Sequence, residues 1–431
     1  KTCPTRCTAI TVETRSDSRR WQIDFECPRC AGAVSLEETE RIFTCAWCRV
    51  KLCLGHRGHL ECVIPPPAPP DGEILYIPYW RLKGMAFSCL SRGTIEAGAV
   101  DLSHIALAAP FLPWSLGIQP QLARLRLLSP GIRGTFFSPS VTIGEALAGY
   151  EAGMKQLGVS PWTAPAHHRA WIGEQVSLVY YPLALRNGEV VDALRGRPVM
   201  PAARWEKAAL AVYKPESRVR FFAAACPDCG WDLEGDRDTL VLTCRNCERA
   251  WLRGQEGLED MDFRVIPDDS GGPQVGLPFW RIRAAVDGIP LDTFADYVRF
   301  CNLPRAVTRA MEEAPFFFWV PAFKTGAGLY LRLIRRMTLY QWQGEFGRQM
   351  GPLECHPVTL PAEEGAESLK TALADLAADK RSVLPRLEEI GITLKEAVLV
   401  YMPFRARGGE LIQPRIPLGI QRKALQYGLN I

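Results

Sequence analysis

The sequence predicts an α+β protein made of two tandem copies of one unit, in which a four-cysteine ribbon precedes a β-rich domain with a few helices. Three observations support this prediction. Two sets of paired Cys-x-x-Cys motifs share the same internal spacing of fourteen residues and begin 199 residues apart (226 minus 27). Short landmarks follow each set in the same order. A hairpin with glycine-containing turn residues recurs near the end of each unit.

Each set of motifs has the spacing of a structural metal site. The eight residues are Cys27, Cys30, Cys45 and Cys48 in the first unit, and Cys226, Cys229, Cys244 and Cys247 in the second. One Cys-x-x-Cys turn directs two sulfurs at a point about 2.3 Å from a zinc ion, and a second turn completes the tetrahedron. We therefore expect two zinc ions per chain. Iron in an electron-transfer site and a redox-active dithiol are the alternatives.

The match between the halves continues beyond the cysteines. The IPYWR segment at residues 77–81 returns as LPFWR at 277–281, at an offset of 200, and LVYYP at 178–182 returns as LVYMP at 399–403, at 221. Landmarks in one order at a slowly growing offset indicate duplication. The expected domains are an N-terminal extension with the first ribbon (1–65), a β-rich domain (73–200), the second ribbon (222–267) and a second β-rich domain (276–431).

Local patterns place several elements within these domains. Strand-like runs at 177–185 and 189–194 flank Asn187-Gly188, a preferred pair for a two-residue hairpin turn, and Gly408-Gly409 occupies the matching place in the second unit. Apolar periodicity and capping signals predict helices at residues 142–157, 292–300 and 363–376.

Four further ligand-type residues lie close together in the first unit. Cys53, His56, His59 and Cys62 are spaced by three throughout, which is compatible with a third metal site. The competing interpretation is a hairpin that continues the first ribbon, because the equivalent stretch at 251–265 has no Cys or His. Cys3 and Cys7 are additional ligand candidates.

The aromatic landmark strands have two interpretations. Large aromatic rings contribute most of the buried area in a small β domain, which favours a core role. The alternative is a docking surface formed by Trp80 and Arg81 in the first unit and by Trp280 and Arg281 in the second.

Composition is that of an ordinary globular protein, with 47% hydrophobic and 23% charged residues. The formal charge of +4 is uneven: residues 1–220 carry 26 basic and 19 acidic residues (+7), and the remainder carries 25 and 28 (−3). No stretch reaches the roughly 18 apolar residues of a membrane span, and no secretory signal is visible. Cysteines used as metal ligands then favour a cytoplasmic protein, peripheral to a membrane complex if it is associated with one.

The paired knuckles followed by a Pro-aromatic-Trp strand resemble the transcription-factor-IIB-type and rubredoxin-like zinc ribbons of uncharacterised bacterial proteins. That resemblance covers each ribbon and the short strand after it, and it implies a role in nucleic-acid machinery or in protein docking. The chain lacks the lysine- and arginine-dense loop of nucleic-acid-binding ribbons. Glu189 recurs as Glu410, but both follow hairpin turns where solvated charge is expected. With closed thiolate sites and no convergent acid/base constellation, the sequence predicts a non-enzymatic scaffold with protein partners. A nucleic-acid-binding accessory protein and an iron electron-transfer module are the alternatives.

Overall fold

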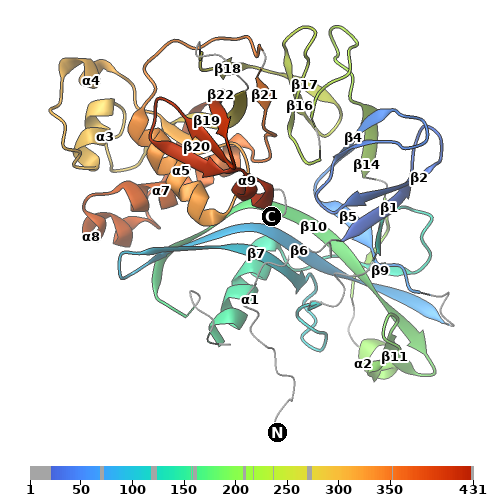
Figure 1. Ribbon diagram of the computed structural model, residues 1–431. Helices are drawn as coiled ribbons and strands as arrows, with labels where there is room; N and C mark the ends of the chain where they lie inside the picture. Colours follow the sequence, from blue (N-terminus) through green and yellow to red (C-terminus); the bar gives the residue numbers. More distant parts are fainter. Residues whose placement is uncertain are drawn as a thin grey trace.

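The computed structural model describes residues 21–67, 72–117, 124–156, 158, 163–206, 210–216, 218–235, 237–268, 274–351 and 353–428. Over these residues the chain is mixed α+β, rich in strands and with short helices, which confirms the predicted fold class at that level (Figure 1). None of the described helices is long and apolar enough to cross a membrane. Cys3 and Cys7 lie outside the described residues.

The two cysteine-rich segments are built of short strands, some in small antiparallel sheets and others at the edges of the two large sheets. The first cysteine segment (residues 21–63) contains β1 (Gln22–Glu26), β2 (Ala33–Glu37), β3 (Ile42–Thr44), β4 (Lys51–His56) and β5 (Leu60–Val63). The second cysteine segment (residues 218–265) contains β14 (Val219–Ala223), β15 (Val241–Thr243), β16 (Ala250–Arg253), β17 (Leu258–Met261) and β18 (Phe263–Val265). Strand β14 pairs with β4, so the two segments share one sheet edge.

The first body after the cysteines is built on two long antiparallel strands, β6 (Glu73–Leu90) and β10 (Ala166–Arg186). Strand β5 joins β10 in parallel, and β7 (Ile95–Ile105) lines the other edge of β6. The remaining strands of this body are β8 (Arg124–Leu127), β9 (Thr135–Phe137), β11 (Glu189–Asp192), β12 (Pro198–Pro201) and β13 (Val212–Tyr213).

The second body repeats this arrangement of pairings. Strands β19 (Gln274–Val286) and β22 (Ile392–Arg407) pair antiparallel, and β18 joins β22 in parallel. The hairpin after β22 leads to β23 (Glu410–Gln413) and β24 (Leu418–Gln421), as the hairpin after β10 leads to β11 and β12. Two further strands pair with β19: β20 (Phe318–Pro321) is antiparallel to it and β21 (Glu354–Cys355) is parallel to it.

The hydrogen bonds around the two tryptophan strands also correspond. The indole N–H of Trp80 donates to the carbonyl of Val141 (2.7 Å), and that of Trp280 donates to the carbonyl of Leu360 (2.8 Å). Each bond joins the central strand to the segment that leads into the next helix. The two bodies therefore hold equivalent helices against equivalent strands.

Two of the three predicted helices are confirmed. Helix α1 (Ile143–Gln156) begins at a capping box in which Thr142 and Glu145 exchange hydrogen bonds, and α3 (Phe294–Phe300) begins at Thr293. The predicted helix at 363–376 is divided into α6 (Ala362–Glu367) and α7 (Leu369–Leu376). At the break, the Ser368 hydroxyl donates to the carbonyl of Gly365 (2.6 Å) and competes with the regular helical bonds.

Several helices were not predicted. The longest is α5 (Ala327–Tyr340), whose buried residues Tyr330, Leu333, Ile334 and Met337 follow helical spacing. The others are α2 (Ala202–Glu206), α4 (Arg309–Glu313), α8 (Lys380–Val383), the 3₁₀ helix η2 (Leu384–Arg386) and α9 (Arg422–Gly428).

The two bodies share their largest hydrophobic core. Strands β6 and β10 extend beyond the first body, and β6, β7 and β10 run beneath the helices of the second (Figure 1). Met85, Phe87 and Ile172 from these extensions are buried in the same cluster as Tyr330 of α5 and Leu373 of α7. The long strands therefore fix the position of the second body on the first.

Candidate metal centres

The structure brings each set of four cysteines together. Within each set the four sulfur atoms all lie within 4.8 Å of one another. The Sγ atoms of Cys27 and Cys48 are 3.9 Å apart and those of Cys30 and Cys45 are 3.7 Å apart; the matching pairs in the second set are 3.6 and 3.5 Å apart. A tetrahedron with metal–sulfur bonds of about 2.3 Å requires sulfur separations of about 3.8 Å. Both sets therefore have the dimensions of a four-thiolate metal site, and their cysteines form no disulfides.

One backbone conformation recurs in all four Cys-x-x-Cys turns. The residue directly after the second cysteine of each turn has positive φ: Ala31 (57°), Arg49 (60°), Gly230 (72°) and Glu248 (53°). This left-handed residue reverses the chain so that the first cysteine's N–H bonds back to a carbonyl, as Cys27 N does with Gly32 O at 2.9 Å. The turns are thus shaped by their backbone to point both sulfurs at one place.

The surroundings of the sulfurs favour the thiolate at one position in each set. The backbone N–H groups of Cys48 and Trp47 lower the pKa of Cys45 to about 6. In the second set the side chain of Asn246 and the N–H of Trp231 lower the pKa of Cys229 to about 6. Because metals bind the thiolate, these donors assist ligation of an ion. Each set could hold one metal ion closed by four protein ligands, and zinc and iron both suit such a donor set.

The four candidates for a third metal site do not gather into a group. Among the described residues, only the two tetracysteine sets bring three or more ligand atoms together. Cys53 packs in a core cluster with Leu242 and Trp251 of the second cysteine segment. Cys62 is buried in the first body's core, His56 bonds through Nδ1 to the carbonyl of Gly58 (2.8 Å), and His59 lies edge-on against Trp80.

The suggested docking surface at Trp80, Arg81, Trp280 and Arg281 needs correction. Trp80, Arg81 and Trp280 are buried, and both indoles are held by the hydrogen bonds described above. Arg81 forms an ion pair with the equally buried Glu38 (3.2 Å), and its guanidinium also lies over the ring of Trp21. Arg281 is half-buried over the ring of Phe317. Trp80, Arg81 and Trp280 therefore belong to the core and do not form a docking surface.

Sequence reasoning missed two exposed aromatic residues beside the thiolate sites. Trp47 and Trp231 are 71% and 59% exposed, the highest values among the described tryptophans. Trp47 lies between the cysteines of a second turn and packs over Gly32, where a side chain would overlap its ring. Trp231 occupies the position in the second set that Gly32 occupies in the first, two residues after a cysteine. Each set therefore presents one tryptophan at the same side of its first turn.

The two cysteine segments pack directly on each other. The Arg253 guanidinium donates to the carbonyl of Leu54 (3.1 Å), and Arg57 forms an ion pair with Glu256. Both contacts join residues separated by 199 positions (253 minus 54 and 256 minus 57), the same interval that separates the cysteine sets. Equivalent positions thus meet across the contact between the segments.

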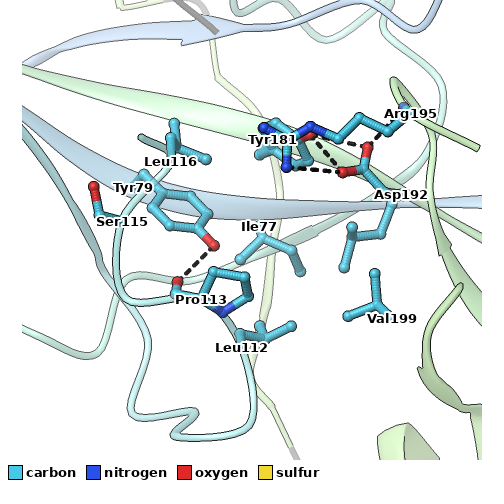
Figure 2. A pocket seen from close by; sticks show the side chains of 11 residues that line it. Ile77, Tyr79, Leu112, Pro113, Ser115, Leu116, Tyr181, Asp192, Arg195 and Val199 are labelled. Atoms are coloured by element: carbon cyan, nitrogen blue, oxygen red, sulfur yellow. Dashed lines mark hydrogen bonds and ion pairs between the residues drawn. The ribbon is translucent and has the colours of Figure 1, made fainter. Parts of the chain in front are cut away.

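The two tyrosines and the aspartate that line a small pocket in the first body are engaged in hydrogen bonds. Figure 2 shows that the Tyr181 hydroxyl points to the Asp192 carboxylate, which it reaches at 2.9 Å, and that the Tyr79 hydroxyl donates to the Pro113 carbonyl at 3.0 Å. Asp192 also accepts the backbone N–H groups of the turn that follows it. In the second body, Gln413 likewise accepts the backbone N–H groups of the turn that follows it. Asp192 is therefore a turn-forming residue, and the space beside it measures only about 50 Å³.

Comparisons with known proteins do not assign this chain to a family. No protein-family model matches it, and no significant match was found among curated proteins or solved structures.

Proposed function

We propose that the protein is a non-enzymatic zinc-binding scaffold whose paired zinc ribbons dock another protein. The closed geometry of the two tetracysteine sets supports this proposal most directly. Four thiolates around zinc leave no position for a water or a substrate, so the ion stabilises the fold and does not activate a reactant. Because such sites couple ion binding to folding, each ribbon depends on its ion.

The proposal includes a tandem duplication of ribbon and β-rich domain. It is supported by the repeated strand pairings, by the matched indole hydrogen bonds of Trp80 and Trp280, and by the contacts between residues 199 positions apart. Contact between equivalent positions is characteristic of a twofold interface. In this arrangement the two ribbons form an internal pseudo-dimer.

The docking role rests on Trp47 and Trp231. A water-exposed indole beside a rigid, metal-clamped turn offers a large apolar area at little cost in conformational entropy, and tryptophan is enriched among the residues that dominate binding energy in protein interfaces. We therefore assign the partner to the exposed side of the ribbons.

The test combines metal analysis with partner capture. We expect two zinc ions per chain by elemental analysis, whereas visible absorption by ferric thiolate would support the electron-transfer alternative. The Trp47→Ala/Trp231→Ala double variant should retain both ions and lose the proteins captured by the wild type from extracts of the native organism. Trp114, 44% exposed on the first body, provides the matched control Trp114→Ala, which should capture normally.

Unchanged capture by the double variant would refute the docking role. Tight binding to DNA or RNA that weakens steeply with salt would instead support the nucleic-acid alternative.

A further inference from the structure

A cavity lined by basic side chains lies where four parts of the chain meet. Its volume is about 270 Å³. Arg41 and His59 reach it from the first cysteine segment, Asp238 and Arg253 from the second, Gln175 from β10, and Lys324 from the loop after β20. None of these residues belongs to the tetracysteine sets, and none is used in the proposed docking surface.

Three cations line this cavity, Arg41, Arg253 and Lys324. Arg41 and Lys324 are 7% and 4% exposed. Burial lowers the pKa of Lys324, of Arg41 and of Arg253, the last to about 10, and Arg41 further lowers that of Arg253 by repulsion. Burying like charges together is unfavourable unless a counter-charge accompanies them. The chain therefore maintains a positive site at a cost that a bound anion would offset.

Both guanidinium groups keep donors available. Arg41 donates through Nη1 to the carbonyls of Glu38 and Glu40, and Arg253 donates through Nε and Nη1 to the carbonyls of Thr239 and Leu54. These bonds to backbone carbonyls do not use Arg41 Nε and Nη2 or Arg253 Nη2. Backbone carbonyls thus fix the orientation of each guanidinium while leaving part of it for a ligand.

The cavity also carries hydrogen-bond acceptors that the described chain does not satisfy. Asp238 is 6% exposed, and its Oδ1 accepts no hydrogen bond; neither does Oε1 of Gln175. With Glu364 also at the wall, the three cations face two carboxylates, which leaves one positive charge in excess. The complementary ligand is an anion that also carries a hydrogen-bond donor.

We propose that this cavity binds the phosphate group of a small phosphate monoester. A monoprotonated phosphate offers acceptor oxygens to Arg41, Arg253 and Lys324, and its P–OH group can donate to Asp238. Its second ionisation lies near pH 6, so the monoprotonated form that can donate to Asp238 is abundant near that pH and persists as a minor fraction at neutral pH. The volume of the cavity exceeds the size of one phosphate group and leaves room for a short organic substituent.

Comparison of phosphate with sulfate tests this assignment directly. Sulfate matches phosphate in shape but carries no proton at neutral pH, so it cannot donate to Asp238. Calorimetric titration of the zinc-loaded full chain should show binding of glycerol phosphate, with sulfate at least about tenfold weaker, the effect of one lost hydrogen bond to a charged group. Titration with inorganic phosphate distinguishes free phosphate from a phosphate ester as the ligand. An affinity equal to that of glycerol phosphate identifies free phosphate, and a weaker affinity identifies the ester.

Variants assign the recognition to individual residues. Lys324→Met should weaken phosphate binding at least about tenfold, and Asp238→Asn should reduce the preference for phosphate over sulfate. Lys423→Met, at an exposed position of α9, is the matched control and should bind as the wild type does. If Lys324→Met does not fold, as judged by circular dichroism, Arg253→Lys keeps the charge and removes the planar fork, and it should also weaken binding.

The proposal is overturned if neither phosphate nor glycerol phosphate binds at millimolar concentration, or if sulfate binds as well as phosphate. Acetate binding in place of phosphate would also overturn it, as would wild-type affinity in folded Lys324→Met or Arg253→Lys protein.

Discussion

At the scale of single residues, the geometry of each Cys-x-x-Cys turn depends on one left-handed backbone residue as well as on the two cysteines. The left-handed residue after each second cysteine is a glycine in only one of the four turns, at Gly230. Ala31, Arg49 and Glu248 hold a conformation that costs a non-glycine residue about 1–2 kcal/mol. The chain tolerates this cost where the turn must present two sulfurs to one ion.

This conformation predicts a stabilising substitution. Arg49 is exposed, with φ of 60°. Arg49→Gly should raise the free energy of unfolding by up to about 1 kcal/mol, because relief of the left-handed strain exceeds the entropy that glycine adds to the unfolded chain. Arg29→Gly, inside the first turn at a residue without positive φ, is the control and should lower it. Chemical denaturation of zinc-loaded protein measures both, and a loss of stability in Arg49→Gly would contradict the strain argument.

A half-buried histidine predicts a dependence of stability on pH. Burial lowers the pKa of His356 to about 4, from an unfolded value near 6.5. Between these values the unfolded chain binds more protons than the folded chain, so stability should fall as pH drops from about 6.5 to 4. His356→Gln should show a shallower decline than the wild type when urea denaturation is repeated across this range. Identical slopes in the two proteins would exclude His356 as a source of acid sensitivity, and Lys423→Met should keep the wild-type slope.

At the scale of elements, the sequence was most informative where local chemistry decides the structure. The Asn187-Gly188 hairpin was predicted because both residues accept positive φ (47° and 77°), and α1 was predicted from its capping box. The cysteine sets were predicted from spacing, and the structure gathers them. Such signals involve few residues and do not depend on distant contacts.

Elements that depend on distant contacts were predicted less well. Helix α5 has no side-chain N-cap bond, and it packs on β20, α7, β7 and β6, which no local pattern indicates. The cavity residues Arg41, Asp238, Arg253 and Lys324 are scattered over nearly 300 positions and acquire a common role only through the contact of four chain segments. The burial of Trp80 and Arg81 likewise depends on distant partners. Trp80 bonds to Val141, 61 positions away, and Arg81 bonds to Glu38, 43 positions away.

The separate cysteine sets predict separable metal sites. Cys45→Ser should reduce the metal content from two ions to about one per chain, because three thiolates hold zinc much more weakly than four and the first ribbon loses its closing ligand. Cys244→Ser should do the same for the second ribbon. Cys301→Ser removes a thiol that lies outside both sets and should leave the content unchanged. Elemental analysis measures all three, and full metal content in Cys45→Ser would reject the four-ligand assignment.

At the scale of the whole molecule, the two bodies are not independent of each other. The extensions of β6 and β10 supply part of the second body's core, and β14 from the second cysteine segment completes a sheet of the first. Each half therefore lacks buried surface that the other provides. We infer that the four-segment cavity and the paired ribbons exist only when both halves are folded together.

This interdependence predicts one cooperative unfolding transition. Phe87, 1% exposed in β6, packs among residues of α5 and α7, so Phe87→Ala should lower the free energy of unfolding by about 3–5 kcal/mol, the usual cost of an enlarged cavity in a core. Because that core belongs to both bodies, calorimetry of zinc-loaded protein should show a single peak that moves to lower temperature as a whole. Trp114→Ala, at an exposed aromatic residue, should move it little. Two peaks in the wild type, or a shift confined to one of them in Phe87→Ala, would show that the halves fold separately in spite of their shared core.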